Sequence, residues 1–450
     1  YKELVEAGKE ADVIVIETMS DLYEVKAAVL AAKENSDKPV LVTMTFEENM
    51  RTFTGVSPEC MVAVLEGLGA DAIGVNCSLG PEELYPVLER ICSLTSLPVI
   101  AKPSAGLPDP VTNEYNVDPE AFAASAVKLA EAGVTIFGGC CGTTPEHIRA
   151  VTEALAGRER NVRTVKRVSI ACSAVNCVTI NQPRVIGERI NPTGKKRFKE
   201  ALMAHDIDYI LGQAVEQIHA GAEILDVNVG LPGIDEKEMM VTAVKAVQSI
   251  CDTPLQLDST IPEVLEAGLR VYNGKPIVNS VNGEDESLEA ILPLVKKYGA
   301  SVVGLTLDKG GIPKTADGRF AIAEKILKRA MEYGIPKEDV FIDCLTLTAS
   351  AEQDGVMETL NALHRVKTEL GLRTVLGVSN ISFGLPNREL ITRTFLTMAL
   401  HSGLDLPIIN PNVEGIIGAV RAYRLLAGID RNSTDFISIY AQDDKAPKAP

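Results

Sequence analysis

The sequence predicts an α/β protein built from two (β/α)8 barrels in tandem, the first lacking about three N-terminal βα units. Short β-branched runs alternate with helix-length amphipathic segments along nearly the whole chain, which is typical of βα units around a parallel sheet. The first part of the chain contains five strand-like runs, and the remainder contains eight. Eight is the number of parallel strands that closes a barrel of this type.

The first unit is placed at residues 1–157. Its strand-like runs are 13–17, 40–46, 72–77, 99–104 and 136–140, with helical patterns between them such as 21–34 and 119–132. In the last of these helices, Asp118 is a plausible N-cap, Pro119 takes the first helical position and Gly133 follows the end. Because five strands cannot close a barrel, we expect the chain to begin inside a domain or its open edge to be covered.

Residues 158–180 separate the two units. The hydrophobic periodicity fails here, and five basic residues are spaced through polar ones. We interpret this segment as a linker or an irregular docking segment. Its two cysteines, Cys172 and Cys177, are more simply explained as incidental than as metal ligands.

The second unit is placed at 181–440. Its strand candidates are 184–189, 223–228, 255–259, 276–280, 301–306, 339–343, 374–379 and 406–410. Eight βα units in about 260 residues match a complete barrel in strand number and size. The tail, 441–450, contains no core-forming residue beyond alanine, which predicts a flexible tether.

The composition of the chain argues against nucleic acids and membranes as binding partners. The chain carries 44 Lys and Arg against 61 Asp and Glu, a net charge of −17 that would repel a phosphate backbone, so nucleic acid is a poor candidate. No apolar run approaches the roughly 18 residues of a membrane span, and no membrane partner is expected. We expect a cytoplasmic protein whose nine cysteines are reduced, so that clustered thiols indicate metal binding or catalysis.

Nearly every strand of the second unit is followed by, or ends in, a carboxylate or an amide. Reacting groups of (β/α)8 enzymes lie at these strand ends. Any one of these residues could simply cap a helix or form a turn, but that explains the whole set less easily. A ring of acids and amides suits a neutral heterocycle rich in N–H donors, such as a pterin. The set comprises Glu188, Asn191, Asp226, Asn228, Asp258, Asn279, Asp343 and Asn380.

Three cysteines follow strands of the first unit. Cys77 ends one strand run, and Cys140 and Cys141 end another, with glycines on both sides. Neighbouring residues in a strand point to opposite faces, so Cys140 and Cys141 can share a metal only where the backbone turns, which the glycines permit. Three thiolates on Zn²⁺ leave one position open for an incoming thiol. The alternative is that all three are small hydrophobic core residues.

The motifs around these residues resemble known families. The segments GVNCS and GGCCGT resemble the zinc-thiolate homocysteine-binding barrel shared by cobalamin-dependent methionine synthases and betaine–homocysteine methyltransferases. The segments IGERINPTG, LDVNVG, QLDST, IVNS, FIDCL and LGVSNISFGLPNR resemble the methyltetrahydrofolate-binding barrel of the same synthases and of acetogen corrinoid methyltransferases. The two barrels in this order resemble the family of cobalamin-dependent methionine synthases.

The resemblance implies roles for individual residues. It implies that Cys77, Cys140 and Cys141 are zinc ligands and that Glu17 holds the amino group of homocysteine. It implies that Asp258, Asn279 and Asp343 bind the pterin, while Glu188, Asn191, Asp226 and Asn228 line the same mouth. Asn380 matches an amide near N5 of the folate and Arg388 a folate-contacting arginine, and Asn380 and Asp343 are the expected catalytic pair.

The function implied is the substrate-binding portion of a 5-methyltetrahydrofolate–homocysteine S-methyltransferase. The methyl group would pass from N5 to Co(I) of cobalamin and then to zinc-bound homocysteine thiolate, giving methionine. No DxHxxG motif occurs, so cobalamin would be carried by a corrinoid-binding module outside this chain, toward which the tail leads. Two alternatives stay open: a methyltetrahydrofolate:corrinoid-protein methyltransferase whose first barrel only docks, and a non-enzymatic scaffold that presents folate.

Two departures from that family stand out in the first unit. The GAMGT-like motif of its first strand does not occur here. Where many members read PNAG, this chain has Pro103-Ser104-Ala105-Gly106 preceded by Lys102, so a hydroxyl replaces an amide. Both departures concern the side of the site that would receive homocysteine.

Overall fold

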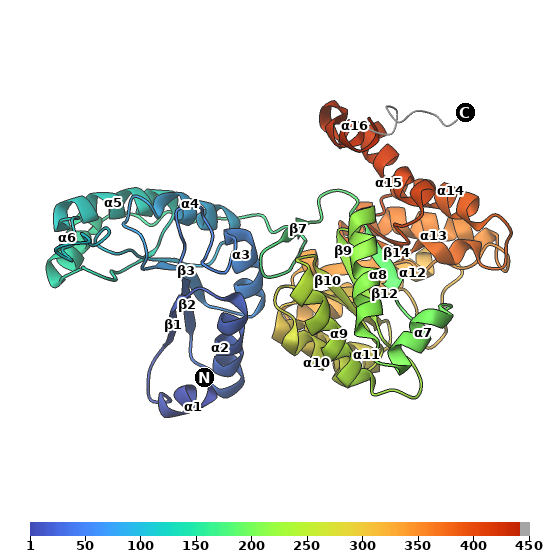
Figure 1. Cartoon of the computed structure of the whole chain (residues 1–450), viewed down its shortest axis with the longest axis horizontal. Coiled ribbons are helices and arrows are strands. Elements are labelled where there is room, and N and C mark those ends of the chain that lie inside the picture. Colours follow the sequence, from blue (N-terminus) through green and yellow to red (C-terminus); the bar gives the residue numbers. More distant parts are fainter. Residues whose placement is uncertain (442–450) are drawn as a thin grey trace.

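The computed structural model describes residues 1–441, so positions 442–450 of the predicted tether lie outside the described residues. Two α/β units lie side by side and are joined through a short hairpin (Figure 1). Among the described helices, none has the length and hydrophobicity needed to cross a lipid bilayer.

The first unit is an open sheet of five parallel strands in the order β1-β2-β3-β4-β5, as the sequence predicts. Helix α5 shows why the local prediction succeeds. The Asp118 carboxylate accepts a hydrogen bond from the N–H of Ala121 at 2.8 Å, and Gly133 ends the helix with a φ of 109°. The elements are α1 (Lys2–Ala7), β1 (Ile14–Met19), α2 (Leu22–Asn35), β2 (Val40–Met44), α3 (Pro58–Gly67), β3 (Ala72–Asn76), α4 (Tyr85–Leu94), β4 (Val99–Lys102), α5 (Pro119–Ala132), β5 (Ile136–Phe137) and α6 (Pro145–Leu155).

The segment between the units is not irregular throughout, and that part of the prediction is wrong. Strands β6 (Ile170–Cys172) and β7 (Cys177–Thr179) form an antiparallel hairpin. It is anchored to the second unit, because the N–H of Cys172 donates to the Lys275 carbonyl at 3.0 Å and the reverse bond measures 2.9 Å. Two three-residue strands are too short to show a period of two, so only their pairing reveals them.

The second unit is a closed barrel of eight parallel strands, which confirms the (β/α)8 prediction. Each strand lies within a few residues of its predicted run. The elements are β8 (Ile186–Ile190), α7 (Lys196–Met203), α8 (Ile207–Ala220), β9 (Ile224–Asn228), α9 (Glu236–Ile250), β10 (Leu255–Asp258), α10 (Pro262–Val271), β11 (Ile277–Asn282), α11 (Asp285–Tyr298), β12 (Ser301–Leu305), α12 (Ala316–Glu332), η1 (Lys337–Asp339), β13 (Val340–Asp343), α13 (Asp354–Arg365), η2 (Val366–Leu370), β14 (Arg373–Gly377), η3 (Val378–Ser382), α14 (Arg388–His401), β15 (Leu406–Ile409), α15 (Glu414–Leu426), η4 (Arg431–Ser433) and α16 (Thr434–Tyr440).

The lower interior of the barrel is an apolar layer. Each of seven strands contributes one fully buried side chain to it, and Ala171 and Ile180 of the hairpin region pack beneath. These residues seal the end of the barrel at which the strands begin. The layer consists of Ile186, Ile224, Ile277, Val303, Phe341, Val375 and Leu406. Polar groups further along the same strands are therefore confined to the opposite end, where the strands finish.

The first unit docks against the sealed end of the barrel. Lys26 of α2 is only 1% exposed, and its ammonium donates to the carbonyl oxygens of Leu269 and Tyr272, each at 2.6 Å. These carbonyls lie at the C-terminal end of α10, where a cation is favoured by the helix dipole. Burial nevertheless lowers the pKa of Lys26 to about 7, with the Arg270 guanidinium adding to the effect.

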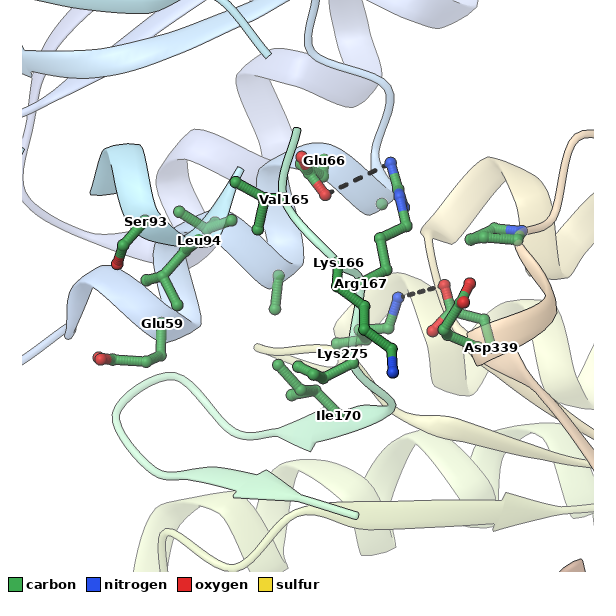
Figure 2. A pocket seen from close by; sticks show the side chains of 16 residues that line it. Glu59, Glu66, Ser93, Leu94, Val165, Lys166, Arg167, Ile170, Lys275 and Asp339 are labelled. Carbon is green, nitrogen blue, oxygen red and sulfur yellow. Dashed lines mark hydrogen bonds and ion pairs between the residues drawn. The ribbon is translucent and has the colours of Figure 1, made fainter. Parts of the chain in front are cut away.

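Around this contact the backbones approach closely and further ion pairs cross the junction. A Cβ on Gly299 would lie 2.3 Å from the backbone of Gly67, so glycine is required there. A pocket between α3, the linker and the barrel contains the Lys275–Asp339 pair at 2.8 Å and the Arg167–Glu66 pair at 3.4 Å (Figure 2). The pocket lies at the strand-beginning end of the barrel, away from its mouth.

Replacement of Lys26 by alanine is expected to destabilise the junction. It leaves two buried carbonyls without their donor and opens a cavity, so we expect Lys26→Ala to lower the free energy of unfolding by about 3 kcal/mol. Urea denaturation followed by circular dichroism measures this loss. Lys33→Ala on the same helix removes only a solvent-exposed pair with Asp71 and should cost less than about 1 kcal/mol. Equal losses for the two variants would contradict a special role for Lys26.

Candidate functional site

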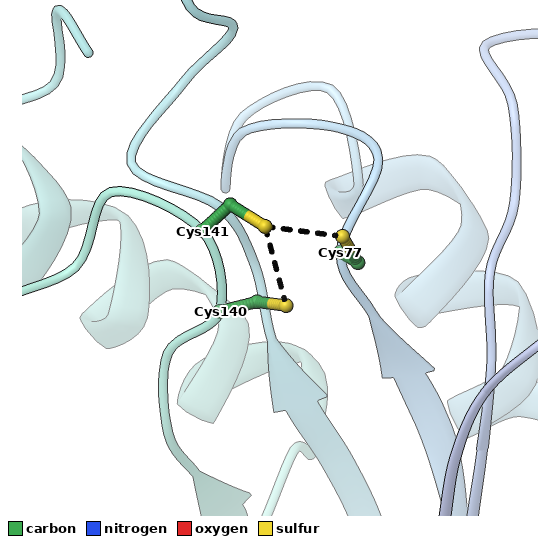
Figure 3. A group of neighbouring side chains, drawn as sticks. All are labelled: Cys77, Cys140 and Cys141. Atoms are coloured by element: carbon green, nitrogen blue, oxygen red, sulfur yellow. Dashed lines mark hydrogen bonds between the residues drawn. The ribbon is translucent and has the colours of Figure 1, made fainter. Parts of the chain in front are cut away.

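The three cysteines of the first unit meet at the ends of its strands. The sulfur of Cys141 lies 3.6 Å from that of Cys77 and 4.0 Å from that of Cys140, and all three lie within 4.8 Å of one another (Figure 3). Cys77 adopts a φ of 64°, the left-handed turn that brings its side chain toward the others. The N–H of Cys140 donates to the Pro103 carbonyl at 2.9 Å, which fixes the backbone that carries Cys140 and Cys141.

The pKa values of two of these neighbouring thiols shift in opposite directions. Burial alone would raise the pKa of Cys77. Hydrogen bonds from the backbone N–H of Ser78 and from the neighbouring thiols outweigh burial and hold this pKa below its ordinary value. Burial and the hydrogen bond with Cys77 raise the pKa of Cys140 to about 11. One thiol of the cluster therefore ionises more readily than its neighbour, as expected when thiolates compete within one site.

The donor set fits a soft divalent metal. Three sulfurs converge at a half-exposed rim, and thiolates are the ligands that Zn²⁺ prefers together with imidazole. Among residues 1–441, this is the one group of three or more acidic, histidine or cysteine side chains that meets the spacing for a metal. Three protein ligands leave a fourth tetrahedral position for a ligand.

A row of polar side chains lies beside the cysteines on the concave face of the first sheet. Asn76 is central to it: its amide oxygen accepts bonds from the N–H of Thr18 at 2.8 Å and the hydroxyl of Thr43 at 2.7 Å. Its amide nitrogen lies 3.8 Å from the Cys140 sulfur. The exposed carboxylate of Glu17 forms an ion pair with the ammonium of Lys102. Asn76 and Lys102 were not among the residues identified from the sequence, because nothing local indicates that they face the cysteines.

The predicted pterin residues on the strands face the interior of the second barrel. Asp226 and Asn228 follow Ile224 of the apolar layer at steps of two along β9, so all three point inward. The same step from the apolar layer places Glu188, Asn279 and Asp343 in this upper, polar part of the barrel, and the strand register places Asp258 there. Asp258 lies in register with Asn228 on one side and with Asn279 on the other.

Gln256 belongs to this polar part, and sequence reasoning missed it. It lies two residues before Asp258 on β10, so both side chains point to the same face, and its amide N–H donates to the Asp226 carboxylate at 2.7 Å. Its amide oxygen is buried without a hydrogen-bond partner. An unpaired buried acceptor is costly unless a ligand supplies a donor. The sequence offered one signal: in the motif QLDST, Gln256 lies two residues before Asp258 and so shares its face of the strand.

Burial raises the pKa of the four acidic side chains predicted to line the barrel mouth. Burial raises the pKa of Asp343 to about 7 and that of Asp258 to about 6, despite hydrogen bonds that oppose the shift. Burial and the charge of Asp258 raise the pKa of Asp226 well above its ordinary value. Burial also raises the pKa of Glu188, against the nearby Lys195. These acids sit where water solvates them poorly, so an N–H donor of a ligand would bind them strongly.

The remaining predicted residues follow strands β8 and β14, with Asn191 in a turn, Asn380 in η3 and Arg388 at the start of α14. Asn191 accepts a hydrogen bond from the N–H of Thr193 at 2.8 Å, which is the turn-forming role considered above. Asn380 is exposed in η3, after β14. Arg388 donates to the Ser379 carbonyl and the Ser382 hydroxyl, both at 3.1 Å, and stacks on Phe383. Arg388 thus holds the loop that carries Asn380.

Comparisons with known proteins agree with this division. Residues 1–155 match the family model for homocysteine S-methyltransferase, and residues 187–410 match that for pterin binding enzyme. The chain thus resembles a homocysteine S-methyltransferase in its first unit and a pterin binding enzyme in its second, and its resemblance to the methionine synthases is confirmed. It is 35% identical over 430 residues to methionine synthase of Mycobacterium leprae and 36% identical over 425 residues to that of Mycobacterium tuberculosis.

These matches cover most of this chain but only part of each methionine synthase. Each covers 89% of this chain and 36% of the relative, so the chain spans about a third of the length of these relatives. A solved dihydropteroate synthase from Xanthomonas albilineans aligns with 58% of this chain, and with 98% of its own, at 19% identity and a TM-score of 0.48.

The raised pKa of Asp343 predicts a pH dependence of stability. Its carboxyl has a pKa of about 7 in the folded protein against 3.8 ordinarily, so the folded state binds the extra proton between these values. Stability from this group is therefore complete below its ordinary pKa and is lost as the pH rises through about 7.

Asp343→Asn should remove this dependence, since asparagine keeps the oxygen that accepts from the N–H of Leu345. Relative to the wild type, we expect the variant to gain roughly 2–4 kcal/mol on going from about pH 4 to about pH 8. Urea unfolding across this range measures the gain, with Asp308→Asn at an exposed position as control. Parallel pH profiles for Asp343→Asn and the wild type would contradict the assignment.

Proposed function

We propose that the chain is the substrate-binding portion of a 5-methyltetrahydrofolate–homocysteine S-methyltransferase. The observation that carries the proposal is the combination, in one chain, of a three-thiol cluster in a homocysteine S-methyltransferase domain with a carboxylate-lined pterin-binding barrel. The thiol substrate and the folate would occupy separate units. Each unit would present its ligand at the ends of its strands.

In the first unit, Cys77, Cys140 and Cys141 would hold zinc. When bound, zinc supplies the positive charge that keeps a substrate thiol ionised near neutral pH. Asn76 would orient Cys140 through its amide nitrogen. Glu17, which is exposed on the concave face, would accept hydrogen bonds from the amino group of homocysteine.

In the second unit, the buried carboxylates would accept hydrogen bonds from the N–H groups of the pterin. Asp258 and Asp343 would bind directly, with Asn228 and Asn279 completing the same part of the wall. Loss of a methyl group from N5 is easier when N5 is protonated, so the site must favour the protonated amine. Asn380 could accept a hydrogen bond from that N–H, and Asp343, with its pKa of about 7, could hold a proton near neutral pH.

The methyl acceptor would be cobalamin, whose cobalt supplies the nucleophilic chemistry when the cofactor is bound. We propose that a corrinoid-binding module outside the described residues presents it to both units in turn. A role of the first unit in docking alone is not favoured, because that unit matches a homocysteine S-methyltransferase model over residues 1–155. The cytoplasm is the proposed location of the protein.

Folate binding tests the second unit. We expect calorimetry to detect methyltetrahydrofolate binding by the intact chain. Asp258→Ala should weaken it at least about tenfold, because it removes a charge-assisted hydrogen bond. Asp308→Ala, an exposed position outside the barrel interior, should bind like the wild type. A well-folded chain that binds no methyltetrahydrofolate would remove this half of the proposal.

Zinc content tests the first unit. We expect about one zinc ion per chain, and its loss in Cys140→Ser and Cys141→Ser because two sulfurs no longer form the site. Elemental analysis by mass spectrometry after dialysis gives the ratio. Cys251→Ser, a half-buried cysteine outside the cluster, should retain zinc. Unchanged zinc in all three variants would count against the cluster.

A further inference from the structure

Lys102 forms an ion pair across the concave face of the first sheet. It ends β4, and its ammonium contacts the Glu17 carboxylate of β1, although β2 and β3 lie between these strands. The two charged groups therefore meet in front of the sheet instead of along a strand pair. Their side chains are 21% and 53% exposed respectively, so a solute can reach both of them.

The packing around Lys102 directs its side chain toward Glu17. Lys102 is in register with Asn76 of β3, so the two side chains lie on the same face. On the other side, a Cβ added to Gly138 would come within 2.9 Å of the Lys102 side chain. The absence of a side chain at Gly138 therefore leaves the room that the stem of Lys102 occupies.

The same residue is tied to the three-cysteine cluster. The Lys102 carbonyl accepts a hydrogen bond from the N–H of Cys77 at 3.0 Å, and the next residue, Pro103, accepts from the N–H of Cys140. Asn76, the register partner of Lys102, lies 3.8 Å from the Cys140 sulfur. The cation, the carboxylate and the sulfurs thus share one rim of the sheet.

We propose that Lys102 binds the α-carboxylate of the thiol substrate, which makes it a specificity-determining residue of this site. The inference rests on the proposed function, in which the thiol is an amino acid whose ammonium binds Glu17. A zwitterion placed between Glu17 and Lys102 offers each of them an opposite charge. Their mutual contact is partly exposed to water and therefore contributes little stability, so a ligand can replace it at little cost.

The experiment compares three thiols that differ in one charged group each. The zinc-loaded chain is titrated calorimetrically with L-homocysteine, with its decarboxylated analogue homocysteamine, and with its deaminated analogue mercaptobutanoate. Lys102→Met should weaken binding of homocysteine and mercaptobutanoate about tenfold and leave homocysteamine unchanged. Lys102→Arg should restore most of the affinity because it keeps the charge. Zinc is measured in each variant so that metal loss is recognised.

Two further variants sharpen the comparison. Glu17→Gln should show the opposite pattern, with weaker binding of homocysteine and homocysteamine and unchanged mercaptobutanoate. Lys128→Met, at an exposed lysine on α5 whose side chain is 62% accessible, should bind all three thiols like the wild type.

Equal effects of Lys102→Met on all three thiols, or no effect on any, would overturn the assignment of Lys102 alone. If the zinc-loaded wild-type chain binds none of the thiols, the homocysteine part of the proposed function fails with it. The two failures are distinguishable because only the second abolishes thiol binding itself.

Discussion

The sealing of one end of the second barrel by apolar side chains is the constraint on which its chemistry depends. Side chains alternate along a strand, so each inward position is followed two residues later by another. The lower positions are Ile, Val, Phe and Leu, and the hairpin β6–β7 closes the space beneath them. Water cannot reach the carboxylates from below, which is why burial dominates the pKa shifts of Asp226, Asp258 and Asp343.

The hairpin also determines where the first unit can sit. It binds the barrel through Lys275 and continues from the first unit, so docking takes place at the end where the strands begin. Lys26 and the close approach of Gly67 to Gly299 strengthen that contact. The mouth of the barrel is left clear of the first unit. The end of the barrel at which its strands finish, where barrel enzymes bind their ligands, therefore stays accessible.

The first unit uses the same strand ends for a different chemistry. The left-handed conformation of Cys77 and the turn after β5 bring three sulfurs together, which regular strands would keep apart. The concave face beside them carries one negative and one positive group, Glu17 and Lys102, where the barrel mouth carries several acids. This difference in charge supports the proposal that the first site binds a charged amino acid and the second a heterocycle with N–H donors.

Local patterns in the sequence determined much of this protein. Strand runs, the Asp118 cap of α5 and the strand-end placement of the acids all depend on residues within a few positions of one another. The three-dimensional structure decided what depends on contacts between distant residues. The hairpin at β6–β7, the unpaired amide oxygen of Gln256 and the meeting of Glu17 with Lys102 are of this kind. None has a periodic signal, because partners far apart in sequence become neighbours only when the strands align and the sheets curve.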